Sequence, residues 1–246
     1  MKAKLFSCVT TVNLVVSLVF AQQTKAATLE FFDHNDFVNS TGKLTVIDFD
    51  DLPTGNGVLS GDEFGSQGLI IVQREGLPIN VLSGKDIDIG FPGNVNSKPN
   101  VISSSFILGN YNNANSDNFD FLLANPSFSA GLWIGNTGSG GNDTTEVQFL
   151  DNFGQVIANE IIGFHSPGLI TGNNIYDNRI FYGITSTVPI ATIRTIEPAF
   201  DGDGITYDDI QFNSPESRSV PEPGSIFGLF LLGGFGLHSL LLRISQ

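Results

Sequence analysis

Hydrophobic residues in the central part of the chain occur in short runs that are separated by turn-forming residues. Several runs alternate with polar residues, so Val147 and Phe149 would share one face of a strand, as would Phe119 and Phe121. No stretch within 28–213 keeps the 3.6-residue apolar period of a capped helix. The pattern predicts strands at residues 29–32, 44–49, 69–73, 79–82, 100–108, 119–124, 131–135, 146–150, 156–164, 179–185, 191–196 and 205–212.

Glycine, asparagine, aspartate and proline fill the segments between these runs, as at 53–57, 136–142 and 201–204. Short strands without intervening helices predict an all-β domain, an antiparallel β-sandwich, over residues 28–213. A length of about 190 residues suits one domain. The 21 phenylalanines suit a core filled from two inner sheet faces.

The N-terminal residues 1–27 have the pattern of a signal peptide with a short leader. Lys2 and Lys4 precede the apolar run 12–20, and small residues follow it. Cys8 is the single cysteine of the chain and lies in this segment. The mature body is therefore expected to have no disulfide, although an exported protein could form one.

The C-terminal residues 225–242 contain no formally charged side chain. At about 1.5 Å per helical residue they would span roughly 27 Å, enough to cross a bilayer core. Arg243 follows at once and marks the cytoplasmic end, which places the body outside. Residues 214–219 form a short linker between the body and this predicted transmembrane helix.

Val220, Pro221, Glu222 and Pro223, followed by the apolar run and Arg243, resemble the PEP-CTERM sorting signal of bacterial envelope proteins. The resemblance covers 220–246. It implies recognition by the membrane protease-transferase exosortase, removal of the helix, and passage to the cell surface or an extracellular polysaccharide matrix. The tail departs from the family pattern in having one arginine in place of a basic cluster.

The body also resembles jelly-roll domains that are frequent in proteins with this signal. Residues 179–186, 190–193 and 203–212 are similar to the C-terminal half of such domains, and 48–53 with 68–71 to their opening. The resemblance implies a jelly-roll-like sandwich. Similar jelly rolls in carbohydrate-binding modules hold a calcium ion between their first and last strands.

The formal net charge of −14 and the pI of about 4.3 argue against nucleic acid as a partner, and against binding an anionic polymer by charge alone. They fit cation binding or solubility outside the cell. Flexible Asp-rich turns supply the oxygen ligands that calcium requires, but aspartate and glycine are also ordinary turn residues. Both interpretations stay open for Asp48 and Asp50 on one face of a predicted strand, Asp201 and Asp203 in a glycine turn, and Asp208 and Asp209 on the last strand.

Aromatic residues are the second group of candidate ligand-binding positions. Tyr111 and Tyr176 lie in asparagine-rich loops, where an exposed ring beside amides suits a sugar. Such tyrosines are also common packing lids. Trp133 lies among apolar neighbours, so a core position competes with a role as a sugar-stacking platform.

Enzyme signatures are sparse. Ser139 lacks the first glycine of a nucleophile elbow, and no helix pattern follows the glycines of 135–141. We expect an exported envelope or matrix protein whose sandwich binds polysaccharide without catalysis. The alternative is a structural or adhesive matrix protein with protein partners. A polysaccharide-processing enzyme, which needs only two suitable carboxylates, is the third hypothesis.

Overall fold

The computed structural model describes residues 26–83, 100–107, 110–111, 116–135, 144–163, 165–171, 178–197 and 204–213. The predicted signal peptide up to residue 25, the linker and the predicted sorting signal lie outside these residues. No helix among the described residues is long and apolar enough to cross a membrane.

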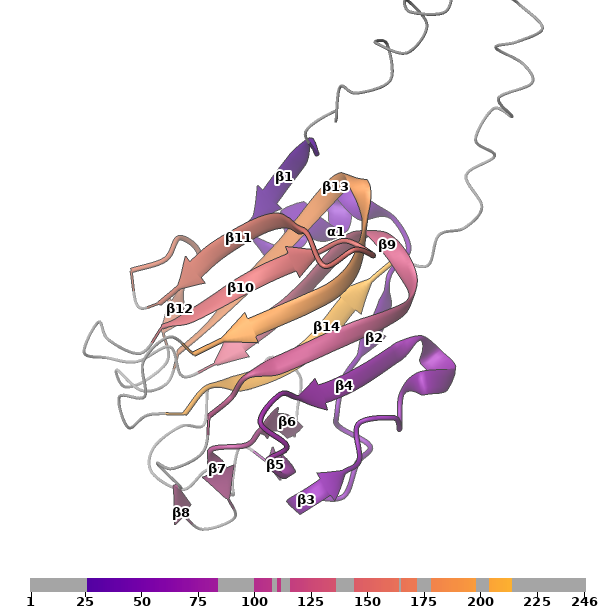
Figure 1. The fold of residues 1–246 in the computed structure, drawn as a ribbon. Coiled ribbons are helices and arrows are strands. Elements are labelled where there is room, and N and C mark those ends of the chain that lie inside the picture. The colour runs from indigo at the N-terminus through magenta and orange to yellow at the C-terminus, as the bar shows by residue number, and fades with distance from the viewer. Residues whose placement is uncertain are drawn as a thin grey trace, which may run out of the picture.

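Two long antiparallel strands, β9 (Phe119–Gly135) and β13 (Asn178–Ile196), organise the fold. Residues 179–185 of β13 pair with 129–135 of β9, and residues 190–194 pair with 120–127. The register shifts between these two stretches, and each stretch has different further neighbours. The paired strands therefore run from one sheet layer into the other, and Figure 1 shows both of them curving over.

The first layer contains the N-terminal part of β9 and the C-terminal part of β13. Its other strands are β4 (Leu69–Gln73) beside β9, then β10 (Thr145–Leu150) beside β13 and β11 (Val156–Ile162) at the outer edge.

The second layer contains the remaining halves of the two long strands. Beside β13 lie two short strands, β1 (Thr28–Phe31) and β12 (Ile170–Thr171). Beside β9 lies β14 (Thr206–Phe212), whose other edge is shared by β2 (Thr45–Ile47) and β6 (Asn100–Ser103). The layer continues through β5 (Ile79–Ser83) to β3 (Gly55–Leu59), and a separate two-stranded sheet is formed by β7 (Phe106–Ile107) and β8 (Asn110–Tyr111).

The core lies where the two layers face each other. Phe119 and Phe121 of the first layer contact Tyr207 of the second, with ring centroids 5.5 and 5.8 Å apart. Phe149 contacts Tyr182 in the same way at 5.6 Å. All five rings are fully buried, so the faces predicted from the period-two pattern are confirmed. The predicted antiparallel β-sandwich is confirmed with them.

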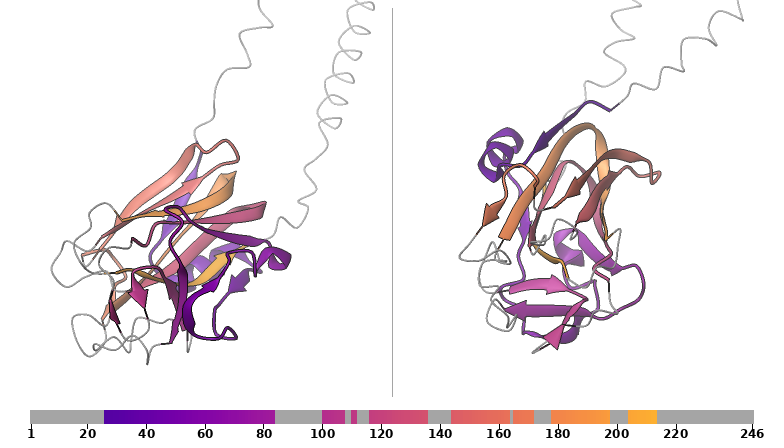
Figure 2. Two further views of the ribbon diagram at one scale, coloured as in Figure 1. Left: turned by 60° about the horizontal axis from the view of Figure 1, so that its bottom comes forward. Right: turned by 90° about the vertical axis from the view of Figure 1, so that its left-hand side faces the viewer.

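The expectation that the body contains no capped helix was wrong, because α1 (His34–Thr41) follows β1. The carboxylate of Asp33 accepts a hydrogen bond of 3.0 Å from the backbone N–H of Asp36, which is an N-cap. Phe37 is the single buried residue of the helix and packs on Phe181. One buried position leaves no periodic signal. The right-hand view of Figure 2 shows α1 on the outside of the sandwich, next to β1.

Two further boundaries differ from the expectation. The predicted strands at 119–124 and 131–135 are one strand, β9, and those at 179–185 and 191–196 are one strand, β13. Pro126 and Pro189 lie in the joining segments, where the ladder between β9 and β13 is interrupted. A proline without an N–H is tolerated there because no ladder bond is lost. In addition, β3 forms at Gly55–Leu59, partly within a predicted turn.

We expect Phe121→Ala to lower the free energy of unfolding of the purified chain by about 3–5 kcal/mol, because it leaves a cavity between the layers. Phe153→Ala is the matched control, since Phe153 is 87% exposed, and it should change stability by less than about 0.5 kcal/mol. Denaturant unfolding measures both. Equal effects of the two substitutions would contradict the packing described above.

Candidate functional site

The predicted calcium ligands are brought together only in part. The predicted strand at 44–49, of which Thr45–Ile47 forms β2, lies beside the last strand, β14, with Ile47 opposite Ile210. However, β2 ends at Ile47, so Asp48 and Asp50 lie in the following turn and not on a strand face as predicted. Asp48 is exposed and Asp50 is half-buried.

The carboxylate of Asp50 has a structural partner. It accepts a hydrogen bond of 3.0 Å from the backbone N–H of Asn100 at the start of β6. The side-chain amide of Asn100 in turn donates to the carbonyls of Phe49, Asp50 and Leu52 at 3.0, 3.3 and 2.9 Å. This exchange ties the turn after β2 to the neighbouring strand.

Asp208 and Asp209 form a bulge in β14. The register to β9 shifts between Asp208 and Gln211, and Asp209 has a left-handed φ of 43°. Asp208 Oδ1 accepts the N–H of Asp209 at 2.8 Å. Both side chains are buried.

No group of three or more His, Cys, Asp or Glu side chains in the described part of the chain is arranged to hold a metal. Asp201 and Asp203 lie outside that part. Calcium therefore stays a prediction from the sequence.

Trp133 is 7% exposed and belongs to a small aromatic cluster on the outer side of the second layer. The rings of Phe181 and His34 each lie 5.6 Å from its ring, and the guanidinium of Arg179 lies 5.8 Å from its centroid. These neighbours place Trp133 in packing contacts and not on an open platform. The side chain of Tyr111 and all of Tyr176 lie outside the described part of the structure.

The side chain of Asp117 accepts several hydrogen bonds and is fully buried. Its carboxylate accepts hydrogen bonds from Ser103 Oγ at 2.8 Å, from the backbone N–H of Ser104 and Ser105 at 2.5 and 3.2 Å, from Ser105 Oγ, and from the backbone N–H of Ile205 at 2.9 Å. Burial raises the pKa of Asp117, and these donors oppose the rise. A carboxylate that accepts five hydrogen bonds from separate parts of the chain holds those parts together.

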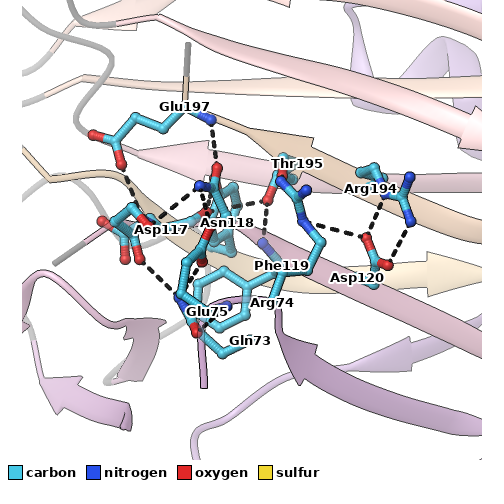
Figure 3. Close-up of polar contacts among 12 residues, drawn as sticks. Gln73, Arg74, Glu75, Asp117, Asn118, Phe119, Asp120, Arg194, Thr195 and Glu197 are labelled. Carbon is cyan, nitrogen blue, oxygen red and sulfur yellow. Dashed lines mark hydrogen bonds and ion pairs between the residues drawn. The ribbon is translucent and has the colours of Figure 1, made fainter. Parts of the chain in front are cut away.

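The backbone of Asp117 extends the same connection. Its N–H donates to Glu197 Oε2 at 2.9 Å, and its carbonyl accepts from Tyr207 Oη at 2.9 Å and Thr195 Oγ1 at 3.2 Å. Figure 3 shows Asp117, Thr195 and Glu197 together. Asp117, which precedes β9, thus connects the segment after β6, the end of β13 and the start of β14.

A second polar group in Figure 3 surrounds Asn118. Its amide donates to Glu75 Oε1 at 2.7 Å and its carbonyl oxygen accepts the N–H of Glu197 at 2.7 Å. Gln73 Oε1 accepts the N–H of Glu75 at 2.9 Å. These bonds fix the end of β4 against the start of β9.

Beside them, Asp120 receives two parallel hydrogen bonds from Arg194, at 2.7 and 2.8 Å. This bidentate contact raises the pKa of the Arg194 guanidinium. The pair links β9 to β13 on the outer face of the first layer.

No family model matches the chain, and no curated protein matches it. Among solved structures, the K2 cleaved adhesin domain of Lys-gingipain matches with a TM-score of 0.44 and 15% identity, covering 70% of this chain and 99% of that domain.

The K1 cleaved adhesin domain of Lys-gingipain from Porphyromonas gingivalis W83 matches with a TM-score of 0.42 and 12% identity, over 70% of this chain and 99% of that domain. The K3 domain has a TM-score of 0.30 and 11% identity, over 57% of this chain and 95% of that domain. These are distant structural similarities.

Asp117→Asn is expected to lower the free energy of unfolding at pH 7 by about 1–3 kcal/mol. The amide NH2 replaces an acceptor oxygen and would point at an N–H or O–H donor. Asp51→Asn, at an exposed position, is the control and should change little. Denaturant unfolding compares the two, and an equal effect at both positions would contradict the role given to Asp117.

The raised pKa of Asp117 also predicts a pH dependence. The folded state keeps the proton to higher pH than the unfolded state, whose value lies near the ordinary 3.8. The stability that Asp117 contributes therefore falls as pH rises from about 3.8 through the raised pKa, and is constant above it. The difference in unfolding free energy between wild type and Asp117→Asn, measured from pH 3 to 7, should fall in this window. A rise would show that the donors outweigh burial.

Proposed function

We propose that this chain is an exported protein, displayed at the cell surface or in an extracellular matrix, whose β-sandwich binds polysaccharide without catalysing a reaction. The observation that carries the proposal is the C-terminal succession of Val220, Pro221, Glu222 and Pro223, the apolar run 225–242 and Arg243. Because this succession is similar to the PEP-CTERM signal, we propose exosortase as the processing enzyme.

The strand order supports a jelly-roll assignment of the body. One layer contains the succession β6–β14–β9–β13, and the other contains β9–β13–β10–β11. β4 extends the layer that contains β11, and β1, β12, β2, β5 and β3 extend the layer that contains β14. Two antiparallel layers joined by two strands that cross between them support a jelly-roll-like sandwich.

The position of the two described chain ends supports a tethered body. Ala27 pairs with Thr187 through two hydrogen bonds of 3.0 and 3.1 Å. Asn213 is held by Ser127 and Ser129, with its Oδ1 accepting from Ser127 Oγ at 2.5 Å and from the N–H of Ser129 at 3.2 Å. Both ends line one cleft, so the chain enters and leaves the sandwich at the same end.

The sorting part of the proposal is tested in the producing cell. Replacing Pro221, Glu222 and Pro223 by alanine should leave the protein in the membrane fraction with its C-terminal helix attached, whereas the wild type should reach the surface or matrix without it. Fractionation followed by mass spectrometry of the C-terminus reads this out. Alanine at Ser217 and Ser219 in the linker is the control. Wild-type protein that keeps residues 225–242 at the surface would contradict processing.

The binding part is tested with the full chain purified in detergent, against neutral and acidic polysaccharides, once with calcium and once with a chelator. Binding that disappears with chelator would support the predicted calcium. Binding in both arms would assign the aspartates to turns. Absence of binding in both arms would favour the structural or adhesive alternative, and release of shortened products would identify an enzyme.

A further inference from the structure

A cleft of about 670 Å³ opens at the end of the sandwich where the chain enters and leaves. One wall is the end of α1 with the turn after it, including Ser40 and Lys43. The opposite side is β1, with Leu29, and the bend between the two halves of β13, with Ser186 and Thr187. The right-hand view of Figure 2 shows these elements gathered at that end. The volume lies in the range of small-ligand sites.

The charge of this lining differs from that of the chain. The protein has 25 acidic residues and a net charge of −14, yet the described residues of the cleft include no carboxylate and one cation, Lys43. A metal cation would find no anionic ligand among them. A polyanion would meet the carbonyl end of α1 and a single ammonium group, within a strongly negative protein.

The hydroxyl groups on the two walls are fixed in complementary roles. On α1, Ser40 Oγ donates to the carbonyl of Phe37 at 2.8 Å, which leaves its oxygen to accept from a ligand. On the β13 bend, Thr187 Oγ1 accepts the N–H of Ala27 at 3.1 Å, and Ser186 Oγ accepts the N–H of Val188 at 3.0 Å. Each of these two hydroxyls keeps its hydrogen to donate. Ser40 therefore offers an acceptor, Ser186 and Thr187 offer donors, and Lys43 adds an ammonium donor on the side of α1.

Apolar surface completes the lining. Leu29 is 65% exposed, and Phe128 is half-buried. A sugar ring has hydroxyl groups that donate and accept at its edge and C–H groups on its faces, so it matches both parts of the lining. An apolar ligand would instead leave the remaining hydrogen-bonding capacity of these hydroxyls unused.

We infer that this cleft binds a short stretch of neutral polysaccharide between α1 and the β13 bend. The inference rests on the proposed function and gives it a location other than Trp133, the candidate aromatic ring that the structure describes, which is not part of this lining. Ser40 and Lys43 contact the ligand from one wall, and Ser186 and Thr187 from the other.

The test uses the full chain in detergent with dextran, mannan and a β-glucan as neutral probes and alginate as an acidic one. Ser40→Trp places an indole in the cleft and should weaken binding of the recognised neutral polymer about tenfold or more, or 1.4 kcal/mol. Asn39→Trp is the matched control, because Asn39 is exposed on the same helix and is not part of the lining. It should bind as the wild type does. Ser186→Ala should weaken binding several-fold by removing one donor.

The outcomes separate the site from the function. If the wild type binds a neutral polymer and Ser40→Trp binds it equally well, the cleft assignment is overturned while polysaccharide binding stands. If the wild type binds alginate alone, the neutral class is overturned. If it binds none of the probes, the inference and the proposed function both fall. Circular dichroism of the two tryptophan variants, which alter adjacent exposed positions, verifies that any loss is not a loss of folding.

Discussion

The pairing of β9 with β13 is the constraint on which the rest of the structure depends. These strands supply the centre of both layers. In the described part of the chain, the strands that hydrogen-bond directly to one of them are β1, β4, β10, β12 and β14. Because the same two strands run through both layers, the spacing and angle of the layers are set by a continuous backbone as well as by side-chain packing. Phe119, Phe121 and Tyr207 then fill the space that this geometry defines.

A second constraint is the satisfaction of buried polar groups at one side of that core. Asp117 precedes β9 and is enclosed by donors from Ser103, Ser104, Ser105 and Ile205. Burying this carboxylate without hydrogen-bond partners would lower the free energy of unfolding, and so would burying its donors without an acceptor. The network therefore specifies one arrangement of β6, β13 and β14 around the start of β9, in a way that apolar contacts alone would not.

The sequence predicted those parts of the fold that depend on local periodicity. Val147 with Phe149 and Phe119 with Phe121 indicated the buried faces because alternation is a property of a single strand. The helix α1 was missed because it buries only Phe37, and its signal lay in the capping pair Asp33 and Asp36. The Asp117 network could not be predicted, since its donors lie between 12 and 88 residues away along the chain. The cleft was missed for the same reason: its walls come from α1, β1, β9 and β13, and no one segment carries its pattern.

The attachment of Asn213 to Ser127 and Ser129 has a mechanical consequence. Asn213 follows β14 directly, and β14 has neighbours on both sides, β9 on one and β2 with β6 on the other. Tension applied to the chain beyond Asn213 and directed along β14 loads the hydrogen bonds on both sides of this strand at once, in shear. Bonds loaded together in shear must break together, whereas an edge strand that is peeled loses them one at a time. A pull on the C-terminal side of the domain therefore first loads a strand that has neighbours on both sides.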